Sequence, residues 1–120
     1  MLFHYQVRDY FLYSQFIDMR KGIDSLAGIV TNHLQKDALT GDLFIFINRR
    51  GNQIKMLHWQ GDGFGVFYKR LEKGTFELPA NNLNLSSQQI SPEKLLFILQ
   101  GVSLKSVKKR MRYTHHFVNK

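Results

Sequence analysis

Two pairs of adjacent basic residues lie in the middle of the sequence, and each pair stands next to a glycine-marked turn. Guanidinium groups bind phosphate through two parallel hydrogen bonds, and ammonium groups act as compact point charges. Clustered cations of this kind are the usual electrostatic footprint of a nucleic-acid-binding surface. We therefore expect this region to contact nucleic acid. The candidate contacts are Arg49, Arg50, Lys55, Lys69, Arg70 and Lys73.

The segment 18–21, with the sequence DMRK, is a second candidate anion site because it precedes an expected helix. Backbone N–H groups at a helix start, together with adjacent cations, favour a bound anion. In this interpretation Arg20 and Lys21 hold a phosphate while Asp18 orients Arg20 through a paired contact. The alternative is structural: Asp18 caps the helix and pairs with Arg20 to fix the entry loop. The sequence leaves both interpretations open.

The C-terminal segment 103–120 is a third basic region, with six basic residues and no acidic residue. Leu104, Val107 and Met111 fall at helical spacing, which is compatible with a short amphipathic helix. Such a segment could bind along the DNA phosphates as an extended arm that becomes ordered on DNA, dock as a helix on a protein partner, or be a charged segment exposed to solvent. The candidate nucleic-acid contacts within it are Lys105, Lys108, Lys109, Arg110 and Arg112.

The charge of the whole chain agrees with a polyanionic partner. Seventeen Lys and Arg residues against nine Asp and Glu residues give a formal net charge of +8, which favours nucleic acid, although a basic surface also serves solubility. The absence of cysteine excludes a disulfide framework and a cysteine-based zinc site. No apolar run approaches the roughly 20 residues that span a bilayer, and the first residues do not resemble a secretory signal. We expect a cytoplasmic protein.

The carboxylates and histidines do not indicate a catalytic or metal site. Active sites of two-metal nucleases and strand-transfer enzymes hold their metal ions between clustered carboxylates, but most of the nine carboxylates here have a local explanation at a helix start, a turn or a loop. The alternating strand and helix pattern of a nuclease fold is also missing. The five histidines lack a metal-ligand spacing. We predict a protein that is not an enzyme and needs no metal or cofactor, and a metal-dependent nuclease is the least favoured alternative.

Apolar periodicity and turn residues predict an α+β fold for residues 1–102, followed by the basic tail 103–120. The expected fold is an antiparallel meander sheet of four or five strands with two helices packed on one face. Asp-Gly and other glycine-marked turns separate the central strands. Strands are expected at residues 10–16, 43–48, 53–59, 64–71 and 75–78, and helices at 23–34 and 92–100.

A meander of this kind determines which turns lie together, because successive turns alternate between the two ends of a sheet. The turn at 49–52 and the turn at 72–74 should share one end, and Asp62 should lie at the other end. The basic side chains of the first and third turns therefore meet. The rings of Trp59, Phe67 and Tyr68 lie on the same strands, and we interpret them as core side chains rather than as platforms for bases.

Three segments resemble one known protein family. They are DMRK at 18–21, IDSLAGIV at 23–30, and the run from Leu43 that includes FYKRLEKGTF. In content, order and spacing they resemble the accessory protein of the sixty-six-type bacterial insertion sequences, the product of the second reading frame. The resemblance implies a role in transposition beside a separate, larger transposase to which catalysis is attributed.

We therefore predict a non-catalytic accessory factor in DNA transposition that contacts DNA through its basic surface. Its expected partners are DNA and the element's transposase. The alternative is a protein–protein module that binds the transposase or a host factor without touching DNA. The two hypotheses predict a different dependence of binding affinity on salt concentration. If about six phosphates are neutralised, log affinity should fall with log salt with a slope of about −5, whereas a protein interface should be less sensitive.

Overall fold

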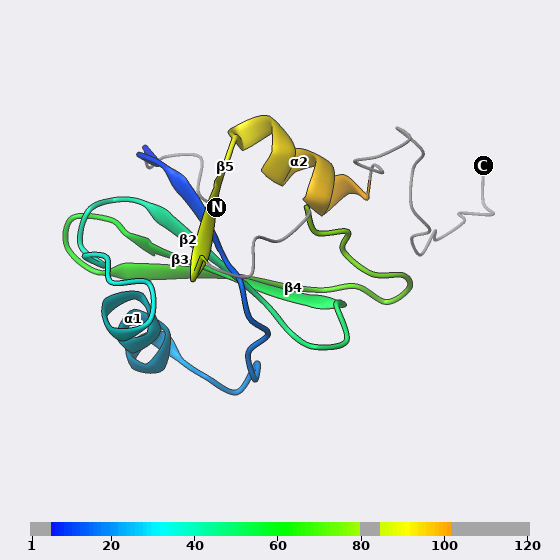
Figure 1. Cartoon of the computed structure of the whole chain (residues 1–120), viewed down its shortest axis with the longest axis horizontal. Coiled ribbons are helices and arrows are strands. Elements are labelled where there is room, and N and C mark those ends of the chain that lie inside the picture. Colours follow the sequence, from blue (N-terminus) through cyan, green and yellow to red (C-terminus); the bar gives the residue numbers. More distant parts are fainter. Residues whose placement is uncertain (1–5, 80–84, 102–120) are drawn as a thin grey trace, which may run out of the picture.

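The computed structural model describes residues 6–79 and 85–101 (Figure 1). Five strands form one sheet in the order β4-β3-β2-β1-β5. No helix among the described residues is long and apolar enough to cross a membrane. The elements, in chain order, are β1 (Tyr10–Tyr13), α1 (Ile23–Asn32), β2 (Leu43–Ile47), β3 (Gln53–Trp59), β4 (Phe64–Arg70), β5 (Ser87–Ile90) and α2 (Pro92–Gln100).

The α+β class and the meander of β2, β3 and β4 are confirmed, but the sheet is mixed rather than purely antiparallel. β1 pairs with β2 in parallel, with Tyr10 opposite Leu43, while β2–β3 and β3–β4 are antiparallel. The physical reason is the long connection between β1 and β2. It contains α1, and a crossover of this length returns the chain to the same end of the sheet, as parallel pairing requires.

The strand predictions for residues 75–90 were wrong in two places. Residues 75–78 form no strand, although the Phe76 N–H donates to the Gly51 carbonyl at 2.7 Å. Instead Ser87–Ile90, where no strand was predicted, forms β5 antiparallel to β1. The sequence SQQI has no apolar alternation because β5 is an edge strand, and only its Ile90 side chain is buried.

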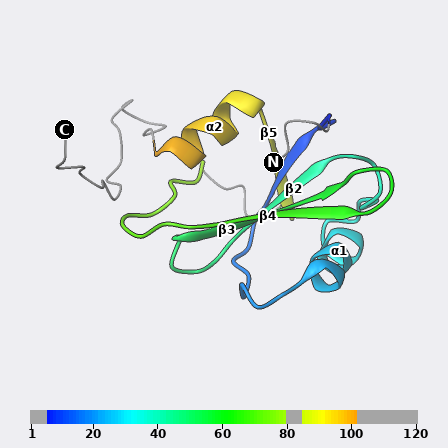
Figure 2. The ribbon, with the colours of Figure 1, turned by 180° about the vertical axis from the view of Figure 1, so that it is seen from behind.

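The two helices pack on opposite faces of the sheet, not on one face as predicted (Figures 1 and 2). Alternate residues of β2 point to opposite sides. Leu43 and Ile45 belong to the buried cluster that contains α2, whereas Phe44 and Phe46 belong to the cluster that contains α1. β2 is buried along its whole length, so both of its faces need a cover. One helix on each side provides that cover.

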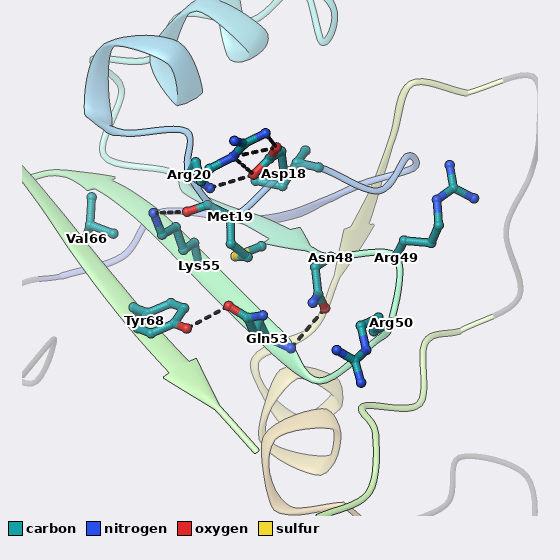
Figure 3. A pocket seen from close by; sticks show the side chains of 11 residues that line it. Asp18, Met19, Arg20, Asn48, Arg49, Arg50, Gln53, Lys55, Val66 and Tyr68 are labelled. Atoms are coloured by element: carbon teal, nitrogen blue, oxygen red, sulfur yellow. Dashed lines mark hydrogen bonds and ion pairs between the residues drawn. The ribbon is translucent and has the colours of Figure 1, made fainter. Parts of the chain in front are cut away.

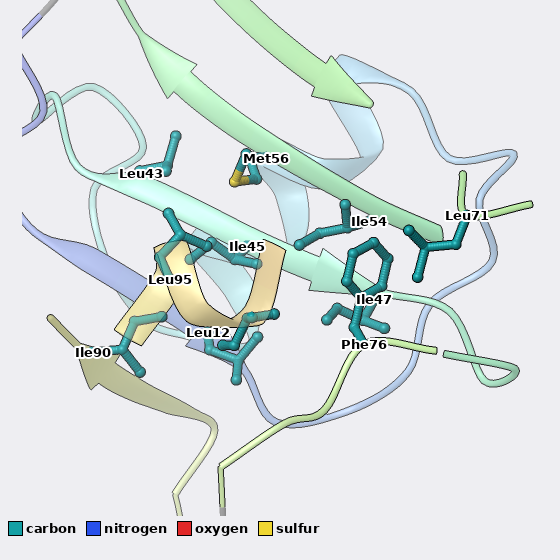
Figure 4. Packing of buried hydrophobic residues seen from close by; sticks show 11 residues of the cluster. Leu12, Leu43, Ile45, Ile47, Ile54, Met56, Leu71, Phe76, Ile90 and Leu95 are labelled. Atoms are coloured by element: carbon teal, nitrogen blue, oxygen red, sulfur yellow. The ribbon is translucent and has the colours of Figure 1, made fainter. Parts of the chain in front are cut away.

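On the α2 face, Leu95 packs above Ile45 and Ile90 (Figure 4). α2 has the limits that its sequence predicted. The Ser91 side chain caps it by accepting a hydrogen bond from the Lys94 N–H at 3.0 Å, and Gly101 ends it with a φ of 81°.

Leu96 of α2 is 49% exposed and belongs to neither buried cluster. On the α1 face, Leu26, Val30 and Leu34 are buried as the periodicity predicted, while Ile23 of the same expected row is exposed. The predicted boundary at residue 102 and the basic tail 103–120 lie outside the described residues.

Candidate nucleic-acid interface

An open groove of about 810 Å³ lies on the α1 side of the sheet, beyond the part that α1 covers (Figure 3). Three elements line it: the loop before α1, the turn between β2 and β3, and the exposed face of β3 and β4. Its lining contains four basic side chains and one acidic side chain. The residues are Ile17, Asp18, Met19, Arg20, Asn48, Arg49, Arg50, Gln53, Lys55, Val66 and Tyr68.

The β2–β3 turn holds Arg49 and Arg50 at one end of the groove. The Asn48 side chain fixes this turn, since its carbonyl oxygen accepts hydrogen bonds from the Asn52 and Gln53 N–H groups at 3.1 and 3.0 Å. Gly51 has a φ of 75°, which a residue with a side chain rarely adopts. The turn is therefore rigid, and both arginine side chains are exposed on it.

Neither Arg49 nor Arg50 forms an ion pair within the described part of the chain. The Arg49 guanidinium lies 5.5 Å from the centre of the Phe16 ring, a cation–π distance that leaves its N–H groups available for other partners. Phe16 is itself 50% exposed. These two arginines therefore provide the cationic charge of the groove that is not already paired.

Lys55, in the middle of β3, fixes the loop that forms the groove's other wall. Its ammonium group donates to the carbonyl oxygens of Met19 at 2.8 Å and Lys21 at 2.9 Å. The Ile17 N–H donates to the Ile47 carbonyl at 3.0 Å, which continues the β1–β2 pairing into this loop. Lys55 thus positions the loop and adds positive potential, while two of its three donors are engaged by the chain itself.

In that loop the Asp18 carboxylate takes the place beside Arg20 that one interpretation of the sequence gives to a phosphate. Its carboxylate accepts hydrogen bonds from the Arg20 backbone N–H at 2.8 Å and from the Arg20 guanidinium at 2.6 to 3.1 Å. The paired contact of both sequence interpretations is confirmed. The capping role is wrong, because Gly22 is the N-cap of α1 and no side chain caps it. The Asp18 carboxylate occupies the Nε and Nη2 side of the Arg20 guanidinium, and a phosphate that binds this side must compete with it.

Tyr68 and Val66 of β4 form the end of the groove away from the arginine turn (Figure 3). The Tyr68 hydroxyl donates to the Gln53 side-chain oxygen at 2.6 Å, and the Lys55 ammonium lies 5.8 Å from the centre of the Tyr68 ring. The ring is 47% exposed. The interpretation of Tyr68 as a core side chain is therefore wrong, whereas Phe67, on the opposite side of β4, packs against the buried cluster on the α2 face.

Comparison with known proteins identifies the family. The family model described as IS66 Orf2 like protein matches residues 8–109. The chain belongs to the IS66 Orf2-like family. It is thus a transposition-associated accessory protein, as the resemblance predicted.

Two relatives of this IS66 Orf2-like chain come from Sinorhizobium fredii (strain NBRC 101917 / NGR234). The protein named y4jC is 29% identical over 97 residues, which are 81% of this chain and 81% of y4jC. The protein named y4hO is 35% identical over 97 residues, which are 81% of this chain and 83% of y4hO. Both are named as uncharacterized proteins. No solved structure gives a significant match.

The remaining predicted contacts of this IS66 Orf2-like chain are distributed around the groove rather than in it. The first and third turns do share one end of the sheet, because the Leu71 N–H donates to the Asn52 carbonyl at 2.8 Å. Lys69, however, alternates with Tyr68 and points to the other side of β4. Arg70 pairs with Glu72 at 3.1 Å, and Lys73 is exposed beyond the end of β4.

Lys21 lies beside the groove, at its loop wall, and contributes a backbone carbonyl to Lys55. The tail candidates lie outside the described residues: Lys105, Lys108, Lys109, Arg110 and Arg112.

The described residues offer no metal site. Among them, no three His, Asp or Glu side chains come together in a way that could hold a metal ion. His58 is buried, with its Nε2 atom 3.1 Å from the Gly41 carbonyl oxygen.

Sequence reasoning missed Phe16, Asn48 and Gln53 as parts of the interface. Asn48 was detectable in principle, since an Asn directly before a basic turn with glycine commonly fixes that turn. Phe16 and Gln53 were not detectable, because their roles depend on contacts with Arg49 and Tyr68 from other elements.

The Asp18–Arg20 pair gives a testable pH dependence. Hydrogen bonds from the Arg20 side chain, and then from its backbone, lower the pKa of Asp18 from 3.8 to about 2. A carboxyl group with a lowered pKa stabilises the folded state above its unfolded pKa and loses that contribution as the pH falls towards 2. We expect NMR titration of the Asp18 carboxyl to give a midpoint near 2. In an Arg20→Gln variant the midpoint should rise towards 3.8.

Lys21→Gln is the matched control for this titration, because the charge of Lys21 has the smallest effect of those that shift the Asp18 pKa. It should leave the midpoint nearly unchanged. An unshifted midpoint in the parent protein would show that the loop does not hold Asp18 and Arg20 together in solution.

Proposed function

We propose that this protein is a non-catalytic accessory factor that binds DNA during transposition of its insertion sequence, beside a separate transposase that carries out the chemistry. The groove on the α1 side is the DNA-binding surface. The observation that carries the proposal is the gathering of Arg20, Arg49, Arg50 and Lys55 around one open groove with Asp18 as its single acid.

Electrostatics supports this assignment. The two arginines on the rigid β2–β3 turn are exposed and form no ion pair with another described residue, so phosphate can bind them without displacing a protein partner. Guanidinium groups suit phosphate oxygens because they offer parallel donors. The net charge of +8 adds long-range attraction towards DNA.

A salt series on the full-length protein tests the proposal. Fluorescence anisotropy with labelled DNA is expected to show binding at low salt that weakens steeply as salt rises. Arg49, Arg50 and Lys55, the three groove cations that are not paired with a carboxylate of another described residue, contribute a slope of log affinity against log salt of about −2 to −3, at 0.7 to 0.9 per neutralised phosphate. Absence of binding to any DNA at low salt would contradict the proposed function.

A second candidate function is docking on the transposase without DNA contact. The observation that favours it is on α2, where Leu96 and Phe97 are 49% and 43% exposed on the face of the molecule opposite the groove. Exposed apolar side chains of this size are common in protein interfaces. Binding to purified transposase that persists at high salt and is lost in a Leu96→Ala, Phe97→Ala double variant would support this function.

A further inference from the structure

The groove has two chemically different ends. Val66 and Tyr68 provide an apolar and aromatic end on β4, while Arg49 and Arg50 provide a cationic end on the β2–β3 turn (Figure 3). Met19 lies between them on the loop wall. A nucleotide has the same division, with a flat base at one side and a charged phosphate at the other.

We propose that the groove binds an unpaired stretch of DNA, with a base stacked on the Tyr68 ring and a neighbouring phosphate at Arg49 and Arg50. This inference rests on the proposed function and narrows it from DNA in general to a single strand. Aromatic rings accept any base by stacking, because every base has a π face. The site therefore needs an unpaired strand but no particular sequence.

The Tyr68 ring is well placed as a platform. Its hydroxyl is held by Gln53 at 2.6 Å, and the Lys55 ammonium lies 5.8 Å from its centre, so its orientation is set before a ligand arrives. A pre-organised ring loses little conformational entropy on binding.

The Tyr68 ring suits an unpaired base rather than a duplex. Bases in a duplex are stacked on each other and expose only their edges, so none can lie flat on a protein ring without leaving the stack. The volume of about 810 Å³ falls in the range of about 300 to 1,000 Å³ that is typical of small-molecule sites. One or two unpaired nucleotides therefore match the space.

The test compares one labelled sequence as single-stranded DNA, duplex DNA and single-stranded RNA, by fluorescence anisotropy with the full-length protein. Tyr68→Ala is expected to weaken single-strand binding about fivefold to 150-fold and to weaken duplex binding much less. Tyr68→Phe keeps the ring but loses the hydrogen bond to Gln53, and it should retain most of the affinity. Phe97→Ala is the matched control, because it removes a ring of similar exposure on the opposite face.

A second measurement uses the unchanged protein and so does not depend on a variant that folds. A fluorescent purine analogue placed in the single strand should be quenched when its base stacks on Tyr68. Lack of quenching, duplex binding as tight as single-strand binding, or equal losses for Tyr68→Ala and Phe97→Ala would overturn this proposal but leave DNA binding intact. Tighter binding of RNA would overturn the assignment to DNA. Failure of all three nucleic acids to bind would contradict the proposed function itself.

Discussion

Replacing both turn arginines, Arg49→Gln with Arg50→Gln, is expected to reduce affinity for single-stranded DNA about 25-fold at 0.1 M salt, since each lost phosphate contact removes a slope of about 0.7. The salt slope itself should become shallower by about 1.4. The effect is large because these arginines make no ion pair with another described residue and stand on a turn fixed by Asn48. Anisotropy across a salt series measures both quantities.

The matched control removes two charges away from the groove, with Arg8→Gln and Lys94→Gln. Arg8 lies at the opposite end of the sheet, where its N–H donates to the Gly41 carbonyl, and Lys94 lies on α2. The net charge of +8 falls by the same amount in both double variants. Equal losses of affinity would mean that DNA senses only total charge, and the groove would not be the binding surface.

The pairing of Asp18 with Arg20 should make Arg20 differ from the turn arginines in the same assay. Because its carboxylate holds the Arg20 guanidinium, Arg20 contributes less to DNA binding than its charge suggests. The turn arginines and Arg20 are therefore not equivalent, although the sequence makes all of them candidate phosphate contacts. This difference arises from pairing, which residue type alone does not reveal.

The elements that the sequence predicted well are those determined by local signals. β3 has the predicted limits because the glycine-marked turns on both sides fix them. α2 begins and ends where Ser91, Pro92 and Gly101 indicated. Both cases depend on residues within a few positions of the boundary, so no tertiary information was needed.

The wrong predictions about the sheet and the helices concern contacts between segments that are distant in sequence. The partner of β5 is β1, with Tyr10 opposite Ile90, and no pattern within the polar segment SQQI indicates such a pairing. The distribution of the helices over the two faces likewise depends on the crossover that contains α1. Turn alternation correctly placed the first and third turns at one end of the sheet, although only the first of them lines the groove. The loop wall was not predictable, because it depends on the contact of Lys55 with the Met19 and Lys21 carbonyls.

The core beneath α1 should be sensitive to the loss of a single ring. Phe46 is fully buried on β2, and its ring meets the Tyr13 ring edge-on with 5.8 Å between centres. Phe46→Ala is expected to lower the free energy of unfolding by about 3 to 5 kcal/mol, since it removes buried apolar area and leaves a cavity. Small domains have only about 5 to 15 kcal/mol in total, so the variant should be close to unfolding. Urea denaturation measures the loss.

Phe97→Ala is the matched control on the opposite face, because it deletes the same ring from a 43% exposed position and should cost less than about 1 kcal/mol. If Phe46→Ala does not fold, Phe46→Leu keeps the measurement possible, with a smaller loss and an unchanged denaturant slope. A loss for Phe46 no greater than that for Phe97 would contradict the packing of α1 on this face. It would also weaken the site, because the groove's loop wall enters α1 and shares the same buried cluster through Ile17 and Met19.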